Sequence, residues 1–283
     1  MRRTSILFGL ICLGIPFSPV SAQEKPTVAI IGTGTLAGAL GPALGQHGYT
    51  VVYGSRDPAR ESVRALVARS GRSASAVGQR EAAAGAGLII LAVPREVVEE
   101  VTGSLGDIDD KIIVDVSGGE KRVAADGYLE LAEDSTNSER IQARHPNARV
   151  VRINLPSIAF FQQPLLVGER ATVPIAGNDP RAREAVARVM FDLGVDPWDA
   201  GPIRFSRVFD AINVMLLVPP QQGRIVDYAL RLMPSISLAC FIDVSELFGF
   251  GRPYDLNDLP DFPRREALIS CEEWGRRLQP GGR

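Results

Sequence analysis

Apolar runs alternate with amphipathic segments through the first half of the chain. Strand-like runs cover Thr27–Ile31, Thr50–Tyr53, Leu88–Val93, Lys111–Val116 and Arg149–Ile153, and helical spacing covers Leu36–Gln46, Pro58–Arg69, Glu96–Leu105 and Asn137–Arg144. This alternation predicts an α/β domain in which a parallel sheet carries helices on both faces. The run Leu88–Val93 contains no polar residue, which is typical of a central strand covered on both sides.

The second half of the chain repeats this pattern once and then becomes helical. A strand-like run at Ala171–Ala176, a helix at Pro180–Leu193 and a strand at Val195–Trp198 precede an apolar helix from Arg204 to Leu217. The stripe on that last helix is more typical of a core or a dimer face than of a cofactor-binding segment. The stripe consists of Phe205, Val208, Phe209, Ile212, Met215 and Leu216. A further helix is expected from Tyr228 to Ile242.

A glycine-rich turn joins the first strand to the first helix. Its residues are Gly32, Thr33, Gly34, Thr35, Leu36 and Ala37, with the spacing of a dinucleotide-binding fingerprint. Gly32 allows the tight turn, Gly34 lets the backbone approach a pyrophosphate, and the N–H groups at the helix start face the anion. We therefore expect the residues from Gly32 to Leu36 to contact a nucleotide.

This motif makes the expected fold more specific. The chain is predicted to be an α/β protein with a Rossmann-type doubly wound parallel sheet and a small C-terminal α/β-plus-helical region. The nucleotide-binding domain is expected to cover residues 23–160, and a C-terminal domain with a helical tail to cover residues 161–283.

The end of the second strand indicates which dinucleotide is bound. An NAD site usually has an acidic residue there to accept hydrogen bonds from the ribose 2′-OH. This chain has Gly54, Ser55 and Arg56 instead, and Arg60 follows one helical turn later. A hydroxyl and a guanidinium suit a 2′-phosphate, which a carboxylate would repel. Ser55, Arg56 and Arg60 therefore predict NADP(H) rather than NAD(H).

The start of the chain predicts export. Residues 1–22 have a basic start at Arg2 and Arg3, an apolar run from Ile6 to Phe17, and small residues before Gln23. These are the parts of a secretory signal peptide, and the run is too short for a membrane span. The residues after Arg3 match the twin-arginine signal poorly, which favours the Sec route to the periplasm or the medium. No membrane span is expected after cleavage.

Composition limits the classes of partner that the protein is expected to bind. The 283 residues are 45% hydrophobic and 23% charged, which suits one or two globular domains with a sizeable core. Cleavage after residue 22 would remove two arginines and leave 29 basic and 33 acidic residues. This mildly acidic balance argues against a nucleic-acid or anionic-membrane partner.

Cysteine and histidine are scarce. Cys240 and Cys271 would remain after export, and a disulfide or two buried thiols are equally consistent with their spacing. With only His47 and His145, the sequence offers no histidine triad or metal-ligand cluster. We therefore expect no metal site and no catalytic side chain.

With these motifs, the chain resembles the NADPH-dependent oxidoreductases of the deazaflavin coenzyme F-420. It is also similar to the N-terminal oxidoreductase domain of the six-transmembrane (STEAP) metalloreductases. The resemblance covers about residues 26–220. The matching segments are Val51–Pro58, Leu91–Glu96, Lys111–Ser117, Val150–Asn154 and Val195–Pro202.

The resemblance implies hydride transfer between NADP(H) and a flavin or deazaflavin co-substrate. Such a transfer needs two rings held close together and no side-chain nucleophile. By position in the family, Ala92, Val93 and Pro94 would lie along the nicotinamide ribose, and Ser117 and Asn154 near the nicotinamide and the acceptor. The partners would be the nucleotide and a soluble redox acceptor, and by analogy a second copy of the chain could form a homodimer.

Two other functions remain open. The first is a dehydrogenase or imine reductase of a small metabolite, which would need a proton donor at the cleft. Lys121 is the one lysine considered for that role, and its Gly-Gly-Glu-Lys sequence is typical of an exposed loop. The second is an exported NADP-binding protein that has no turnover.

Overall fold

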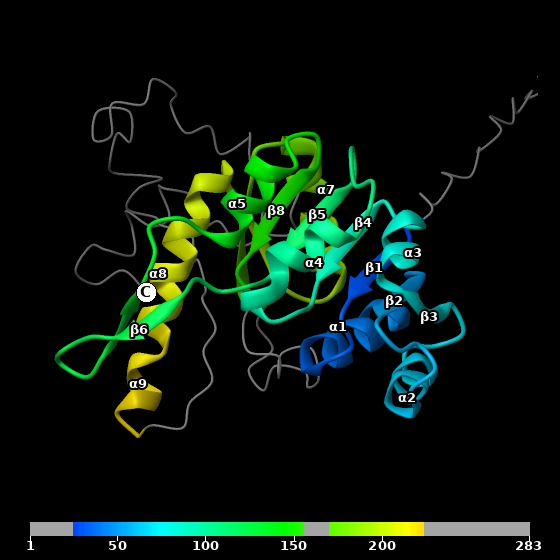
Figure 1. Cartoon of the computed structure of the whole chain (residues 1–283), viewed down its shortest axis with the longest axis horizontal. Helices are drawn as coiled ribbons and strands as arrows, with labels where there is room; N and C mark the ends of the chain where they lie inside the picture. Colours follow the sequence, from blue (N-terminus) through cyan, green and yellow to red (C-terminus); the bar gives the residue numbers. More distant parts are fainter. Residues whose placement is uncertain (1–24, 156–169, 224–283) are drawn as a thin grey trace, which may run out of the picture.

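The computed structural model describes residues 25–155 and 170–223 of the chain (Figure 1). Three sequence expectations lie outside these residues: the signal peptide, the helix at Tyr228–Ile242 and the pairing of Cys240 with Cys271. The expected domain boundary between residues 160 and 161 also falls outside them. No helix within the described ranges is both long and apolar enough to span a bilayer.

One sheet of eight strands organises the described part of the chain. Its strand order is β10-β9-β8-β5-β4-β1-β2-β3, and the six strands from β8 to β3 run parallel. The strands are β1 (Val28–Ile31), β2 (Val51–Ser55), β3 (Ala74–Gly78), β4 (Leu88–Leu91), β5 (Ile112–Asp115), β8 (Arg149–Ile153), β9 (Thr172–Gly177) and β10 (Asp196–Gly201). Along the chain, the parallel strands have the 3-2-1-4-5-6 order of a dinucleotide-binding sheet, so the predicted Rossmann fold is confirmed.

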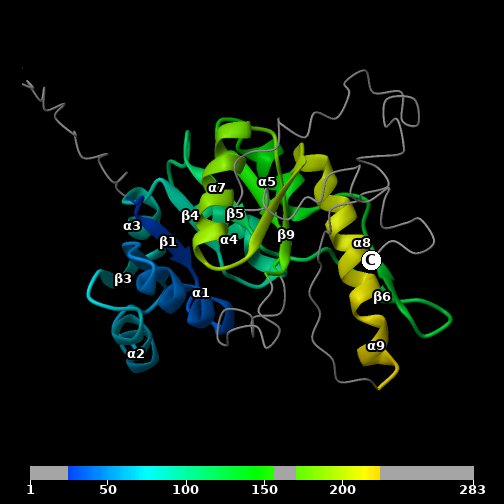
Figure 2. The same cartoon turned by 180° about the vertical axis from the view of Figure 1, so that it is seen from behind.

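Helices cover both faces of this sheet, as the alternating pattern predicts. One apolar core packs α1 (Thr35–Gln46), α2 (Glu61–Arg69) and α7 (Pro180–Asp192) on one face; Figure 2 shows α1 and α7 on that side. The second core packs α3 (Gln79–Ala84), α4 (Val98–Ser104) and α5 (Asn137–Arg144) on the other face. A short 3₁₀ helix, η1 (Arg95–Val97), leads into α4.

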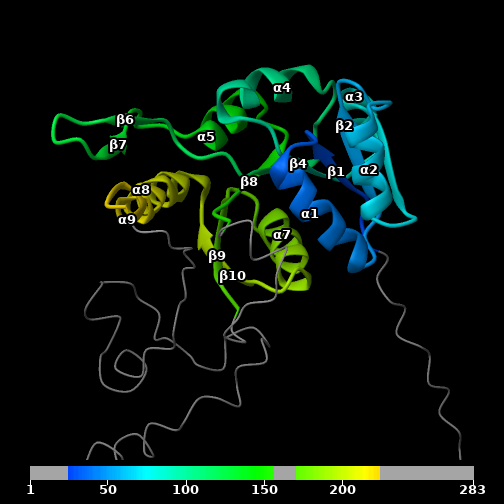
Figure 3. The same cartoon turned by 90° about the horizontal axis from the view of Figure 1, so that it is seen from below.

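An arm extends from the edge of the sheet beyond β8 (Figure 3). It consists of the antiparallel hairpin β6 (Lys121–Val123) and β7 (Leu129–Leu131) and of α8 (Ser206–Leu216) and α9 (Val218–Gln221), which lie side by side. The 3₁₀ helix η2 (Ile203–Phe205) connects β10 to α8. The arm brings the loop that follows β5 against α8.

The sheet is mostly parallel, with one antiparallel pairing that the sequence pattern does not specify. β9 pairs antiparallel with β8, and β10 then pairs parallel with β9. All six residues of β9 are buried, and a fully buried run looks the same whichever way the strand runs. Mixed sheets of this kind are common when an edge pair is added to a parallel sheet.

The apolar stripe of the last helix is also more exposed than it would be if the whole stripe belonged to the hydrophobic core. Phe209 is buried, but Val208 and Met215 are 48% and 59% exposed. The buried face of α8 instead includes two polar residues, Ser206 and Asp210. Helical spacing therefore located the helix correctly, and the exposed part of its stripe stays a predicted dimer face.

Candidate functional site

The glycine turn after β1 is built by close backbone packing. Gly32 has a φ of +112°, and a Cβ there would lie 2.3 Å from the carbonyl oxygen of Ala92. Its N–H donates to the carbonyl of Gly54 at 3.0 Å, which ties the turn to β2. Both the positive φ and the contact with β4 exclude a side chain, since L-residues are strained in this conformation.

Gly34 has a different reason to be glycine. It stands at the N-cap of α1, and a Cβ built there would meet no heavy atom of the described residues within 4 Å. No packing inside the protein therefore requires glycine at this position. The open space beside the first turn of α1 is what the close approach of a pyrophosphate needs, so the residues fit a dinucleotide.

A cleft of about 610 Å³ opens beside this turn. It collects residues from the carboxyl ends of β1, β2 and β4, where nucleotides bind in open α/β sheets. The lining includes nine of the predicted site residues: Gly32, Thr33, Gly34, Ser55, Arg56, Arg60, Ala92, Val93 and Pro94. The other lining residues are Gly54, Asp57, Gln79, Val97, Glu100, Val101 and Ser104.

The charges at the end of β2 favour an anion at one side of the cleft. Arg56 and Arg60 are exposed, and neither forms an ion pair with any other described residue. Ser55 is buried, and its hydroxyl accepts a hydrogen bond from the N–H of Asp57 at 3.1 Å. The carboxylates of Asp57 and Glu100 also line the cleft, so the anion must bind close to the two guanidinium groups.

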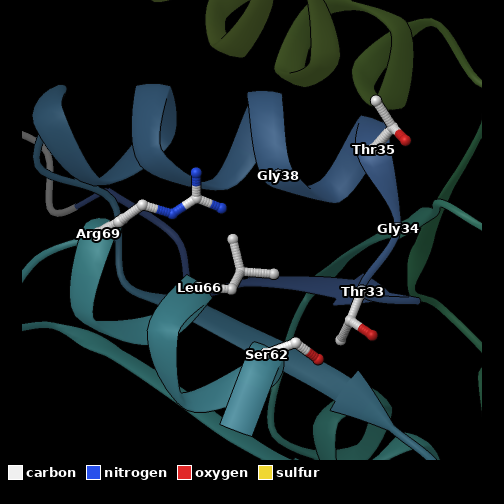
Figure 4. A pocket seen from close by; sticks show the side chains of 7 residues that line it. All are labelled: Thr33, Gly34, Thr35, Gly38, Ser62, Leu66 and Arg69. Carbon is white, nitrogen blue, oxygen red and sulfur yellow. The ribbon is translucent and has the colours of Figure 1, made fainter.

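A second, smaller cavity of about 320 Å³ lies between α1 and α2 (Figure 4). It contains the predicted site residue Thr35 and shares Thr33 and Gly34 with the cleft. Ser62, Leu66 and Arg69 of α2 face α1 across it. Leu36 lines neither cavity and packs against the apolar core beside α1.

Ser117 lies at the carboxyl end of β5 in a network of buried hydrogen bonds. Its N–H donates to Asp115 Oδ1 at 2.8 Å, and its hydroxyl accepts from Asn137 Nδ2 at 2.9 Å. The same amide group also donates to the carbonyl oxygen of Arg95 at 3.2 Å. Asn137 therefore links the loop after β4, which contributes Pro94 to the cleft, to the loop that contains Ser117.

Asn154 is the remaining predicted site residue. It follows β8 directly and is buried, and its N–H donates to the carbonyl of Pro174 in β9 at 3.1 Å. Ser117 and Asn154 both lie at the carboxyl edge of the parallel strands, but neither lines the cleft. Their contact with a nicotinamide or an acceptor stays a prediction.

The structure adds a buried ion pair that the sequence did not indicate. Arg152 Nη2 lies 2.9 Å from Asp210 Oδ1, and the two side chains are 1% and 3% exposed. Arg152 stands opposite Asp115 in the sheet register, and Asp210 comes from α8. Burial raises the pKa of the Asp210 carboxyl, an effect that the Arg152 guanidinium opposes. The only sequence signals were a charged residue in an apolar strand and one on an apolar helix.

This pair also fixes the loop after Ser117. The backbone N–H of Gly119 donates to Asp210, and a Cβ at Gly119 would lie 2.6 Å from Asp210 Oδ2. Glycine at this position therefore lets the carboxylate approach the main chain. Within the described residues, Arg152 Nε and Nη1 have no hydrogen-bond partner. Among the described residues, Asp210 is thus the side chain that pairs with the guanidinium.

Lys121 is not in an exposed loop, which corrects the sequence expectation. It begins β6 and is half-buried, and its Nζ donates to the carbonyl oxygen of Gly119 at 3.1 Å. The fold brings α8 against the hairpin, and packing by that distant segment could not be read from the local Gly-Gly-Glu-Lys sequence. Burial lowers the pKa of the Lys121 ammonium; the nearby Asp210 carboxylate opposes this effect, and Arg95 and Arg152 add to it.

Comparison with known proteins agrees with the resemblance predicted from the sequence. Residues 27–119 match the family described as NADP oxidoreductase, coenzyme F420-dependent. The metalloreductase STEAP3 of Rattus norvegicus is 29% identical over 196 residues, which are 69% of this chain and 38% of that protein. The chain thus spans well under half the length of this relative.

Two solved structures share the fold. A protein from Arthrobacter sp. FB24, provisionally called an F420-dependent NADP-reductase, superposes with a TM-score of 0.64 at 24% identity, covering 74% of this chain and all of its own. An imine reductase variant from Myxococcus stipitatus, solved with NAD⁺, gives a TM-score of 0.53 at 18% identity, covering 70% of this chain and 63% of its own. At these identities the two structures establish the fold alone.

The family match coincides with the fold and the glycine turn. The matched segment contains β1 to β5 and the cleft between them. The chain is thus similar to NADP-dependent oxidoreductases with a Rossmann fold, and the predicted family resemblance is confirmed.

Proposed function

We propose that the protein transfers hydride between NADP(H) and a flavin- or deazaflavin-type acceptor. The observation that carries this proposal is the cleft in which the glycine turn and two unpaired arginines, Arg56 and Arg60, lie together. Residues 32–36 would hold the pyrophosphate, and Ser55 with the two arginines would hold the 2′-phosphate. Bound NADPH supplies a hydride from its nicotinamide, which needs orientation rather than a nucleophile from the protein.

The location of the bound ring follows from the order of the strands. The adenosine half would lie against β2, since the phosphate-binding arginines follow that strand. The nicotinamide would then extend past β4 toward β5, where Ala92 and Ser117 end neighbouring strands. Asn137 holds these two loops together, which would keep the ribose and nicotinamide contacts in a fixed relation.

Acceptor reduction by the purified full-length chain tests this function. Oxidation of NADPH would be followed by absorbance with riboflavin, FMN and a 5-deazaflavin, and with NADH as the control donor. We expect NADPH to reduce at least one of the ring acceptors and NADH to be the poorer donor. Binding of NADPH without oxidation by any acceptor would favour instead an NADP-binding protein without turnover.

A second candidate is a reductase of a small carbonyl or imine metabolite. The half-buried position of Lys121 favours it for a carbonyl substrate, because an ammonium close to Ser117 could serve as the proton donor that such a reaction needs. Keto acids, aldehydes and cyclic imines assayed in the same way separate the two functions. Turnover of one of these compounds with no turnover of the ring acceptors would establish the second.

We also propose that the protein is exported, on the basis of the signal-peptide pattern in residues 1–22. Expression of the full-length gene in a bacterium with an outer membrane, followed by fractionation and N-terminal sequencing, tests this. We expect a periplasmic protein that begins at Gln23. A cytoplasmic protein that retains Met1 would contradict export.

A further inference from the structure

Lys121 is a cation whose position is not explained by the nucleotide cleft. It is the first residue of β6, the first strand of the hairpin in the arm. Its Nζ is 3.2 Å from the position that a Cβ would take on Gly118, the residue next to Ser117. No carboxylate of the described residues forms an ion pair with it, and its one hydrogen-bond partner is the carbonyl of Gly119. An ammonium has three donors, so two remain available.

The hairpin itself does not require a half-buried ammonium at this position. The next residue, Arg122, is exposed and forms an ion pair with Glu130 across the hairpin at 2.6 Å. Lys121 is partly desolvated and lies among charges of both signs: the Asp210 carboxylate stabilises its ammonium, and the guanidinium groups of Arg95 and Arg152 destabilise it. Asp210 already pairs with Arg152 and accepts from Gly119, so it offsets only part of the cost of keeping this ammonium away from water, and a further acceptor atom would offset more.

The loop that carries this lysine is held at both ends by buried carboxylates. Asp115 accepts the N–H of Ser117, and Asp210 accepts the N–H of Gly119. Arg152 lies between the two carboxylates, opposite Asp115 in the sheet and paired with Asp210. Lys121 begins β6 two residues after this anchored segment, and its ammonium lies beside Gly118 and Gly119 in the loop that follows β5, near which the nicotinamide is expected under the proposed function.

We propose that Lys121 binds the hydride acceptor through an oxygen atom conjugated to the ring position that receives the hydride. This inference rests on the proposed function. In the transfer, the C4–H bond of NADPH breaks with its electron pair, a new bond to hydrogen forms on the acceptor, and NADP⁺ remains. The acceptor's negative charge moves to the conjugated oxygen, where the ammonium stabilises it and can give a proton that solvent replaces.

This chemistry selects a class of acceptor. A ring carbonyl of a flavin or deazaflavin gains negative charge as it is reduced, so a fixed ammonium favours its reduction. A protonated imine carries a positive charge before the transfer, and the same ammonium would repel it. Lys121 therefore favours carbonyl-conjugated acceptors over imines at this site.

The test compares Lys121→Met, Lys121→Arg and the matched control Arg122→Met, whose guanidinium lies on the other face of the same hairpin. Riboflavin serves as the probe because it has the ring but no phosphate, and FMN is measured alongside it. Three quantities are determined for each variant: the NADPH dissociation constant, the riboflavin dissociation constant of the NADP⁺-loaded protein, and the single-turnover rate of hydride transfer.

We expect Lys121→Met to weaken riboflavin binding, slow riboflavin reduction, or do both, with a combined effect of about 10- to 100-fold. An effect of this size corresponds to the loss of one hydrogen bond from a charged group. NADPH binding should stay unchanged, Lys121→Arg should recover part of the loss, and Arg122→Met should behave as the wild type. If Lys121→Met does not fold, as judged by circular dichroism, Lys121→Gln replaces it in the same measurements.

The outcomes separate this inference from the proposed function. Wild-type protein that binds NADPH but reduces no ring acceptor overturns the proposed function, and the inference with it. Wild-type turnover that persists unchanged in Lys121→Met overturns the inference alone. A loss seen with FMN but not with riboflavin also overturns it, because Lys121 would then contact the phosphate and not the ring.

Discussion

Replacing Asp210 by asparagine is expected to lower the free energy of unfolding by about 3–5 kcal/mol, the cost of leaving one buried charge without its partner. The Arg152 guanidinium is 1% exposed, and two of its nitrogen atoms already have no partner among the described residues. Asparagine keeps an oxygen for the N–H of Gly119, so the loss would come from the missing charge. Urea unfolding of the full-length chain measures it.

A double variant shows whether the two charges act as a pair. Arg152→Met combined with Asp210→Asn removes both charges, and replacing a buried ion pair by groups of similar size is often nearly neutral. We expect the double variant to be more stable than Asp210→Asn alone. Arg207→Met on the same helix is the control, because Arg207 pairs with Glu139 at the surface and its loss should change stability little.

Two results would contradict this account. Asp210→Asn could unfold at the same urea concentration as the wild type, which would mean that water or another group satisfies the guanidinium. Alternatively, the double variant could lose as much as the two single variants together. In that case the residues contribute independently, and the pair would not be what joins α8 to the sheet.

The glycine turn and the end of β2 could be predicted from sequence because both are local. Gly32 and Gly34 are spaced for a single turn between one strand and one helix, and Ser55 and Arg56 follow the next strand directly. The strand order then follows from the rules for parallel sheets, which bring the ends of β1, β2 and β4 together. Such features need no information about distant parts of the chain.

Elements with small side chains were missed. The strand at Ala74–Gly78 and the helix at Gln79–Ala84 consist mainly of alanine, serine and glycine, which carry little hydrophobic periodicity. β3 lies at the edge of the sheet beside β2 with none of its residues fully buried, and α3 packs against the sheet through Ala82 and Ala83. Pattern alone does not distinguish such segments from a loop.

The buried polar cluster could not be predicted because it depends on long-range packing. Arg152 and Asp210 are 58 positions apart in the sequence, and nothing near either residue indicates the other. Lys121 is drawn into the same region only because α8 lies along the hairpin. The residues that line the cleft beside the glycine turn could thus be predicted from the sequence, whereas the contacts among Lys121, Arg152 and Asp210 became visible only in the folded chain.

Replacing Arg56 by alanine is expected to reduce NADPH affinity by about 10- to 150-fold, which corresponds to roughly 1.5–3 kcal/mol for one charge-assisted contact. NADH has no 2′-phosphate, so its affinity should not change, and the preference between the two nucleotides should narrow. Isothermal titration of both nucleotides against the wild type and the variant measures this. Arg64→Ala is the matched control, since Arg64 is exposed on α2 but does not line the cleft.

The alternative result has a specific structural meaning. If Arg56→Ala and the double variant with Arg60→Ala both keep the preference for NADPH, the 2′-phosphate is not bound at the end of β2. The smaller cavity on the other side of Thr33 then becomes the candidate, because Arg69 and Ser62 line it. Arg69→Ala would abolish the preference in that case and leave it intact otherwise. The variants of Arg56 and Arg60, compared with the variant of Arg69, therefore show on which side of the glycine turn the phosphate lies.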